Sequence, residues 1–119
     1  MPIIDIFSPL KDPPPRLLPS LAIQVREILG LPDDRVWLLW HPIAQSHHFR
    51  PNWSGDPARA GPIVKVRCKS DYSDIQVRSL IQGLAETMAG HLEVPVDSIY
   101  IVVDPVLKGR LFVRGTLWE

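Results

Sequence analysis

The sequence predicts an α+β fold in which two β-α-β halves form a four-stranded mixed sheet with both helices on one face. The first observation is an internal repeat, because residues 31–42 align without gaps on residues 94–105 and share Pro, Asp and Pro positions. A second match joins residues 1–6 to residues 61–66. We therefore expect a single domain over residues 1–119, with pseudo-repeats at about 1–54 and 61–119.

Each half is expected to run strand, helix, strand. The first strands follow Pro2 and Pro62, and the later strands contain residues 36–40 and 99–103. Strands that are joined through a helix should be parallel, with a right-handed connection. The two halves side by side then give the four strands of the sheet.

The helix of the second half is predicted to begin at Ser73, where Ser73 and Gln76 form a capping box. Apolar residues then recur at a helical period and predict one buried stripe. In the first helix Gly30 supplies the C-terminal stop, and Pro19 lies in the tolerated first turn. The stripe residues are Ile75, Leu80, Ile81, Leu84, Met88 and Leu92 in the second helix, and Leu17, Leu18, Leu21, Val25, Ile28 and Leu29 in the first.

The later strand of each half is apolar on both faces, whereas helices cover only one face of the predicted sheet. Other copies of the same chain would cover the second face, so we expect an oligomer. The tail 108–115 predicts a turn into a short strand, with residues 48–53 as its counterpart in the first half. Such short strands often pair across subunits.

Composition restricts the partners. The 13 basic and 13 acidic side chains balance, which argues against nucleic acid or an anionic membrane as partner. There is no signal peptide pattern or apolar segment of bilayer length, and we expect a cytoplasmic protein. The single cysteine, Cys68, excludes an internal disulfide and is best explained as a buried strand residue. The histidines at 41, 47 and 48 fit no metal-ligand spacing, so neither a metal nor another cofactor is expected.

Pro2 is the candidate catalytic residue. If Met1 is removed, Pro2 carries a free secondary amine, and burial beside cations lowers the pKa of such an amine toward neutrality. If Met1 is retained, Pro2 is an acylated, inert residue at the edge of a strand. A carboxylate substrate also needs a cation, and Arg67 and Lys69 should point to the same face of a strand. Lys11, Arg110 and Arg114 are further candidates, although for each cation taken alone a solvated surface charge is the better explanation.

The chain resembles the tautomerase superfamily, which includes 4-oxalocrotonate tautomerase, macrophage migration inhibitory factor and malonate semialdehyde decarboxylase. The resemblance lies in the strand at Pro2, the duplicated halves, the 73–92 helix, the segment 95–100 and the ribbon around Gly109. It covers nearly the whole chain except residues 44–60. It implies a homotrimer with an active site at each processed Pro2, where the proline transfers protons on enols and 2-oxo acids.

The resemblance also assigns further positions. Tyr100 matches a pocket tyrosine or arginine, Phe112 or Leu111 matches an aromatic wall, and Asp34 matches an aspartate that assists the decarboxylase. From the residues alone, Asp34 is better explained as a turn residue, because Asp97 repeats it, and Tyr100 has a core alternative.

Several substrate-binding arginines of the family are absent. Lys11 and Asp12 stand where one arginine would be, and Ser70 and Tyr72 occupy the positions of the decarboxylase pair.

From Pro2 and the resemblance together, we expect a trimeric tautomerase-like enzyme acting on a small carbonyl-containing acid, with Tyr100 stabilising the enolate. A decarboxylase, or a hydratase-dehalogenase, with the same base is the second hypothesis. A non-catalytic oligomeric binding protein with the same fold is the third.

Overall fold

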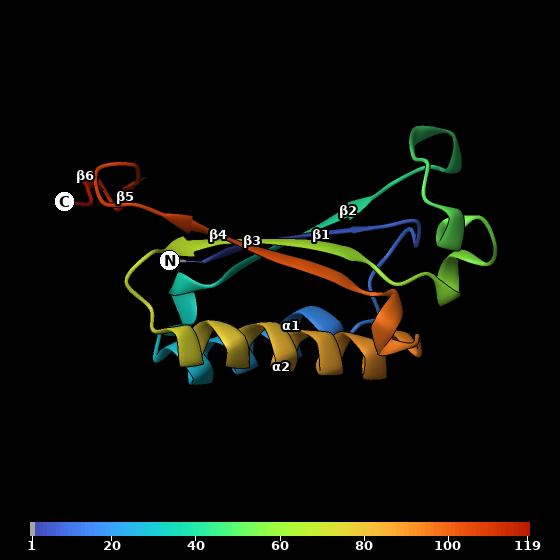
Figure 1. The fold of residues 1–119 in the computed structure, drawn as a ribbon, viewed down its shortest axis with the longest axis horizontal. Coiled ribbons are helices and arrows are strands. Elements are labelled where there is room, and N and C mark those ends of the chain that lie inside the picture. Colours follow the sequence, from blue (N-terminus) through green and yellow to red (C-terminus); the bar gives the residue numbers. More distant parts are fainter. Residues whose placement is uncertain (1) are drawn as a thin grey trace.

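Two β-α-β units and a short C-terminal ribbon make up the computed structural model, which describes residues 2–119 (Figure 1). Whether Met1 is removed, which the sequence leaves open, concerns a residue outside this described range. The first unit comprises β1 (Ile3–Ser8), α1 (Leu17–Leu29) and β2 (Trp37–Pro42), and the second comprises β3 (Ile63–Lys69), α2 (Asp74–Leu92) and β4 (Tyr100–Val106). The ribbon pairs β5 (Phe112–Val113) with β6 (Thr116–Leu117).

The main sheet has the strand order β2-β1-β3-β4. Strands β1 and β2 are parallel, as are β3 and β4, whereas β1 and β3 are antiparallel. This arrangement confirms the predicted mixed sheet. Because Ile3 lies opposite Arg67 and Phe7 opposite Ile63, the beginning of β1 lies beside the end of β3. The two halves of the repeat therefore place their equivalent residues at opposite ends of the sheet.

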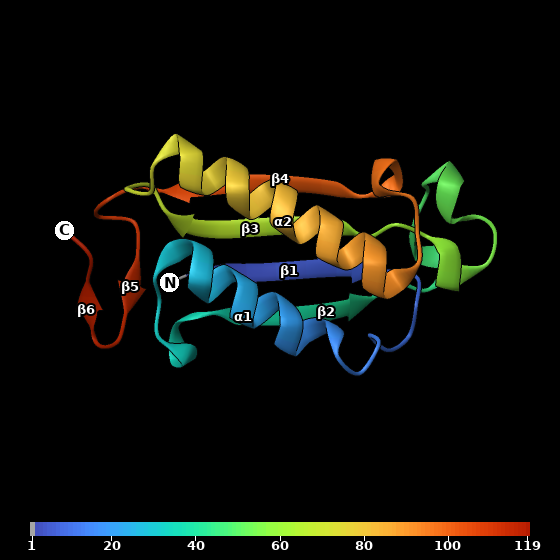
Figure 2. The same ribbon diagram turned by 90° about the horizontal axis from the view of Figure 1, so that it is seen from below.

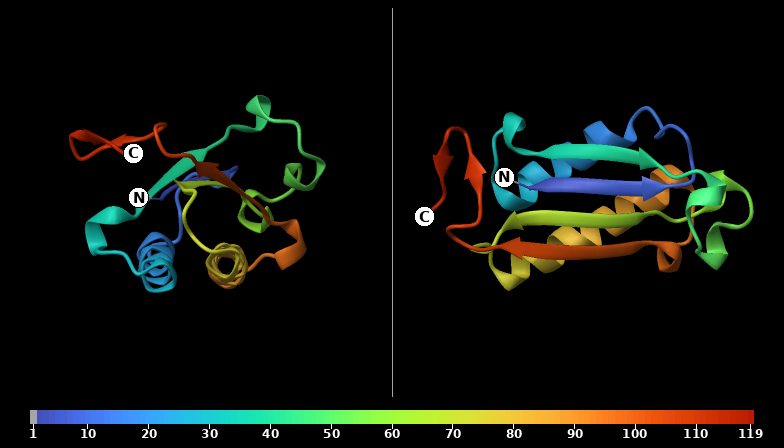
Figure 3. Two further views of the ribbon diagram at one scale, coloured as in Figure 1. Left: turned by 60° about the vertical axis from the view of Figure 1, so that its left-hand side comes forward. Right: turned by 90° about the horizontal axis from the view of Figure 1, so that it is seen from above.

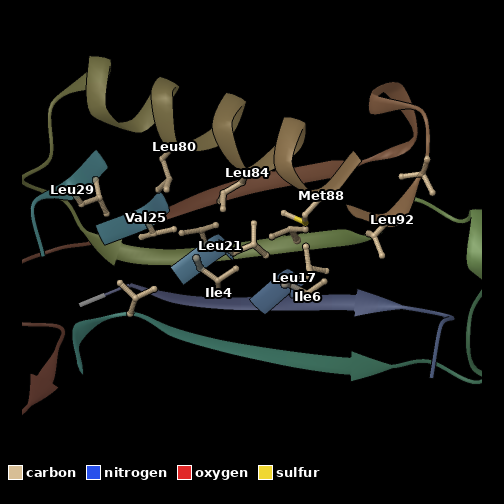
Figure 4. Close-up of a cluster of buried hydrophobic side chains, with 14 residues drawn as sticks. Ile4, Ile6, Leu17, Leu21, Val25, Leu29, Leu80, Leu84, Met88 and Leu92 are labelled. Carbon is tan, nitrogen blue, oxygen red and sulfur yellow. The ribbon is translucent and has the colours of Figure 1, made fainter. Parts of the chain in front are cut away.

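Both helices cover the same face of the sheet (Figure 2). The core lies between them and the inward side chains of the two central strands (Figure 4). Burying aliphatic side chains of this size stabilises a fold by about 1.5 to 3 kcal/mol each. The fully buried members include Ile4, Ile6, Leu17, Leu21, Val25, Val64, Val66, Leu80, Leu84 and Met88.

The helix ends agree with the sequence signals. Ser73 and Gln76 form the predicted capping box, and Gly30 ends α1 in the left-handed region at φ 66°. The prediction for Ile75 is wrong, because this side chain is 78% exposed. Five residues separate Ile75 from Leu80, which corresponds to about 140° around a helix, so Ile75 faces solvent while Leu80 faces the core.

The second face of the sheet is uncovered (Figure 3, right). Burial alternates along β1 and β3, so their odd-numbered residues lie on this face. Large apolar side chains there remain accessible, among them Trp37, Leu39 and Tyr100. His41 on β2 contacts the carboxylate of Asp5 at 2.7 Å and stacks on Phe7. The face thus combines exposed apolar groups with a polar cluster.

The linker between the two units lies at the end of the sheet opposite the ribbon (Figure 1). It contains short 3-10 helices at Gln45–His47, Pro51–Trp53 and Pro57–Arg59. The strand expected at residues 48–53 is therefore absent from the described linker, and that prediction is wrong. Arg50 donates to the carbonyls of Gly61 and Ser98, both at 2.6 Å, and the Trp53 indole donates to Gly61 at 2.7 Å. These side-chain hydrogen bonds hold the linker against the residues that precede β3 and β4.

Candidate functional site

Pro2 is enclosed at one end of the sheet. Its side chain is less than 2% exposed, and its carbonyl accepts a hydrogen bond of 3.2 Å from the backbone N–H of Trp37. The next residue, Ile3, lies opposite Arg67 on β3. Pro2 is therefore held between the beginning of β2 and the end of β3.

A cavity of about 430 Å³ opens at the same end of the sheet as Pro2, which is not one of its lining residues. Arg35, in the 3-10 helix Asp33–Arg35 that precedes β2, and Lys69, at the end of β3, contribute to its walls, and the C-terminal ribbon supplies the rest. The ribbon and the N-terminal end of the chain lie at the same end of the molecule (Figure 2). The ribbon residues of the wall are Val113, Arg114, Thr116, Leu117, Trp118 and Glu119. We call this space the ribbon cavity.

A second cavity, of about 380 Å³, lies between the end of β3, the first turn of α2 and the end of β4. We call it the helix cavity. Lys69 lines both cavities, so its ammonium group is available to either. The other lining residues are Cys68, Ser70, Tyr72, Asp74, Val77, Val103, Pro105 and Leu107.

The ribbon cavity is locally cationic although the whole chain has no net charge. Arg35, Lys69 and Arg114 face one acidic side chain, Glu119. Arg35 is 28% exposed, its Nε lies 3.6 Å from the Asp34 carboxylate, and this Nε has no hydrogen-bond partner among the described residues. A carboxylate in the cavity would find three cationic side chains in its walls.

Cys68 and Tyr72, which both line the helix cavity, have side chains whose pKa is raised by their surroundings. Burial raises the pKa of the Cys68 thiol, which is only 2% exposed. Burial also raises the pKa of the Tyr72 phenol, and the nearby Cys68 and Asp71 add to this effect. Tyr72 therefore presents a hydroxyl that can donate a hydrogen bond in the helix cavity.

The same layout is present in several solved structures. A fused 4-OT trimer superposes with a TM-score of 0.83 at 19% identity, covering 97% of this chain and 94% of that one. Macrophage migration inhibitory factor from Oncomelania hupensis gives 0.79 at 17% identity, covering 100% and 83%. A member of the cis-3-chloroacrylic acid dehalogenase family gives 0.78 at 16% identity, covering 98% and 83%.

These neighbours all belong to the tautomerase superfamily. The chain has the tautomerase fold. This finding confirms the resemblance at the level of architecture. No family model matches the sequence, and no curated protein matches it either.

Within the tautomerase fold, two predicted site residues lie far from Pro2 in their own chain. Tyr100 begins β4 opposite Ile63, and its N–H donates to the Pro62 carbonyl at 3.0 Å. Lys11 follows the end of β1, at the same distant end. The antiparallel pairing of β1 and β3 separates them from Pro2 by the length of the sheet. Near Pro2, the position equivalent to Tyr100 is occupied by Trp37.

The other predicted residues are at the Pro2 end of the sheet. Lys69 lines both cavities, and Arg67 shares its face of β3 as predicted. Asp34 precedes β2, with its side chain 76% exposed, and it contacts Arg35. Arg110 and Phe112 belong to the exposed ribbon segment, and Phe112 is 73% exposed.

The sequence analysis missed Arg35 and Trp118 as lining residues. The signal for Arg35 was its place directly after Asp34, in a segment whose repeat partner carries Ser98 instead. A cation in only one half of a duplicated chain is a candidate for the function of that half. Trp118 lies beyond the ribbon signature, and we find no sequence signal that would have identified it.

The pseudo-equivalent end of the sheet holds Pro62 and a smaller cavity, of about 260 Å³, whose lining includes Phe7, Ile63 and Lys65. Pro62 is fully buried and amide-linked to Gly61, whose carbonyl is held by Arg50 and Trp53. A side chain at Gly61 would collide with the backbone of Ser98, so glycine is required for this close approach. Pro62 is therefore an amide within the chain, which neither donates nor titrates.

No helix in residues 2–119 is both long enough and apolar enough to cross a membrane. Within the same residues, no cluster of three or more His, Cys, Asp or Glu side chains is suited to hold a metal ion. His41 is engaged with Asp5, and His48 packs edge-on against Trp53.

Proposed function

We propose that the protein is a tautomerase-like enzyme that uses the amine of Pro2 to move protons on a small 2-oxo or enol carboxylic acid. The carrying observation is the burial of Pro2 at the end of the sheet where Arg35 and Lys69 line an open cationic cavity. The proposal requires Pro2 to be the first residue of the mature protein. Tautomerase-fold neighbours at 16–19% identity support the scaffold and leave the reaction to be tested.

The environment suits a base. Pro2 is buried, and Arg35 and Lys69 line the cavity at the same end of the sheet, and both burial and nearby positive charge disfavour a protonated amine. The neutral amine is the form that general base catalysis requires. Lys69 and Arg35 would hold the substrate carboxylate.

The reaction balances as an isomerisation. The Pro2 nitrogen takes a proton from the enol hydroxyl or from the carbon next to the carbonyl, and the resulting enolate carries the charge. The protonated amine then returns the proton to the other atom of the pair, so nothing is oxidised or reduced. A hydroxyl donor would stabilise the enolate oxygen, but Tyr72 lines the helix cavity and not the ribbon cavity that holds the substrate. Tyr100 can take this role only in the site of a neighbouring subunit.

The decisive experiment compares the wild type with two variants on a panel of phenylenolpyruvate, 2-hydroxymuconate, 3-chloroacrylate and malonate semialdehyde. Pro2→Ala keeps a terminal amine with altered geometry and basicity, and one alanine inserted after Met1 converts the Pro2 nitrogen into an amide. We expect kcat/KM to fall about 10²- to 10⁴-fold in the insertion variant. Mass spectrometry of the native protein checks that Met1 is absent.

The substrate that turns over separates the reaction classes, since malonate semialdehyde reports a decarboxylase and 3-chloroacrylate a hydratase-dehalogenase. Equal turnover by the insertion variant would contradict the role of Pro2. Retention of Met1, or no turnover of any panel member, would favour the non-catalytic binding protein.

A further inference from the structure

The ammonium group of Lys69 lies over the indole ring of Trp118, with the Nζ atom 4.9 Å from the ring centroid. The two residues come from distant parts of the chain, because Lys69 ends β3 and Trp118 follows β6. A cation over an aromatic face is attracted by the negative potential of the ring. This contact joins two lining residues of the ribbon cavity, one from the main sheet and one from the ribbon segment.

The backbone holds Trp118 in place on both sides. Its N–H donates to the Leu111 carbonyl at 2.8 Å, and its own carbonyl accepts from the Gly109 N–H at 2.7 Å. The pairing of Phe112 with Leu117 extends this ladder toward the tip of the ribbon. These two backbone hydrogen bonds fix the position of Trp118 at the base of the ribbon. Its indole ring can therefore hold the flexible Lys69 side chain in one place.

The Lys69 side chain can extend into either cavity, since it lines both. In the helix cavity Asp74 offers a carboxylate, whereas in the ribbon cavity the indole face attracts the ammonium group. Lysine has a long stem with many rotamers, so a modest attraction decides which cavity its charge occupies. The observed contact with Trp118 places the charge on the side of the ribbon cavity.

We propose that Trp118 is a positioning residue that holds the Lys69 ammonium group at the ribbon cavity, where it binds the carboxylate of the substrate. The inference rests on the proposed function for its role in catalysis, but the contact itself is testable without any substrate. Trp118 acts through Lys69 and touches no reacting atom.

The first test uses no substrate. Lysines are converted to ¹³C-dimethyl-lysine, which keeps the positive charge, and their methyl resonances are followed by NMR. The ring current of Trp118 should shift the Lys69 resonance upfield in the wild type, and the shift should disappear in Trp118→Leu. It should persist in Phe112→Leu, which removes another ribbon aromatic, and the Lys65 resonance, near Phe7, should not change. A Lys69 resonance that Trp118→Leu leaves unmoved would overturn the inference.

The second test separates positioning from structure by kinetics, using whichever panel substrate the wild type turns over. Trp118→Leu should raise KM roughly two- to five-fold with kcat nearly unchanged, as expected for losing a partly exposed cation–π contact. Trp118→Phe should restore most of the KM, and Trp118→Leu should have no further effect when Lys69 is already methionine. A loss confined to kcat, or equal damage from Phe and Leu, would contradict the inference. If the wild type turns over no substrate, the proposed function fails, while the NMR result still decides the contact.

Discussion

Cys68, the second-last residue of β3, has its chemistry set by burial. Its thiol is 2% exposed and has a raised pKa because ionisation would place a charge in an apolar site. The thiol is therefore a packing group and a poor nucleophile, since thiolate is the reactive form. This matches the sequence interpretation of Cys68 as a small buried residue on a strand.

The raised pKa of Cys68 predicts a loss of stability at alkaline pH. An unfolded thiol ionises near pH 8.5, whereas the folded thiol stays protonated, so the folded state binds more protons and the free energy of unfolding falls as pH rises through this range. Below the unfolded pKa the contribution is fully present. Between about pH 7 and pH 9, the wild type should lose more free energy of unfolding in urea than Cys68→Val, which cannot ionise.

The Cys68→Val variant keeps every other titrating group, and Tyr72, whose pKa the nearby Cys68 helps to raise, ionises mainly at higher pH. Far-UV circular dichroism at both pH values gives the two free energies for each protein. A wild type and variant with the same pH dependence would contradict a buried, protonated thiol.

At the same scale, the sequence identified some site residues and missed others for physical reasons. Alternation along a strand is local, so the shared face of Arg67 and Lys69 could be predicted. The separation of Tyr100 from Pro2 depends on the antiparallel pairing of β1 and β3, which the repeat does not reveal. Trp118 meets Lys69 only through the fold of the ribbon, so their contact was invisible.

At the scale of elements, local signals predicted the helices and the central strands. The capping box at Ser73 and the stop at Gly30 act within a few residues, and apolar periodicity reports which face is buried. The linker was predicted least well, because its structure depends on bonds from Arg50 to carbonyls at Gly61 and Ser98, of which Ser98 is 48 residues away in the sequence. Long-range side-chain bonds of this kind leave no local pattern.

Arg50 should therefore be the most sensitive cation of the linker. Arg50→Ala removes two charged donors and leaves the carbonyls of Gly61 and Ser98 without these partners, so we expect a loss of about 2 kcal/mol in the free energy of unfolding. Burial lowers the pKa of this guanidinium, which nevertheless stays charged at neutral pH. Arg59→Ala, at an exposed position of the same linker, should stay within about 0.5 kcal/mol of the wild type.

Urea unfolding of Arg50→Ala and Arg59→Ala side by side measures the difference. Similar free energies of unfolding for the two variants would show that the hydrogen bonds from Arg50 to the Gly61 and Ser98 carbonyls do not stabilise the fold. Activity at Pro2 should be retained in both, because the linker lies at the opposite end of the sheet (Figure 1).

At the scale of the whole molecule, the uncovered sheet face is the main feature that one chain leaves unexplained. Helices bury one face, while Trp37 and Tyr100 on the other remain 46% and 57% exposed, more than a solvated sheet face usually tolerates. Fused 4-OT, a fold neighbour, is a trimer. We propose that this chain also forms a homotrimer through this face, which would bring Tyr100 of one subunit toward a neighbouring copy.

The proposed trimer predicts a selective effect of charge on the open face. Leu39 lies there and is 49% exposed, and Ile23 on α1 is 51% exposed on the helical side, so the two side chains are matched in size and accessibility. Leu39→Lys would bury charges at the interface and should give monomers, whereas Ile23→Lys should leave the trimer intact. Native mass spectrometry reads the assembly, and far-UV circular dichroism confirms that both variants are folded. A monomeric wild type at every concentration tested, or equal dissociation by both variants, would rule out assembly through this face.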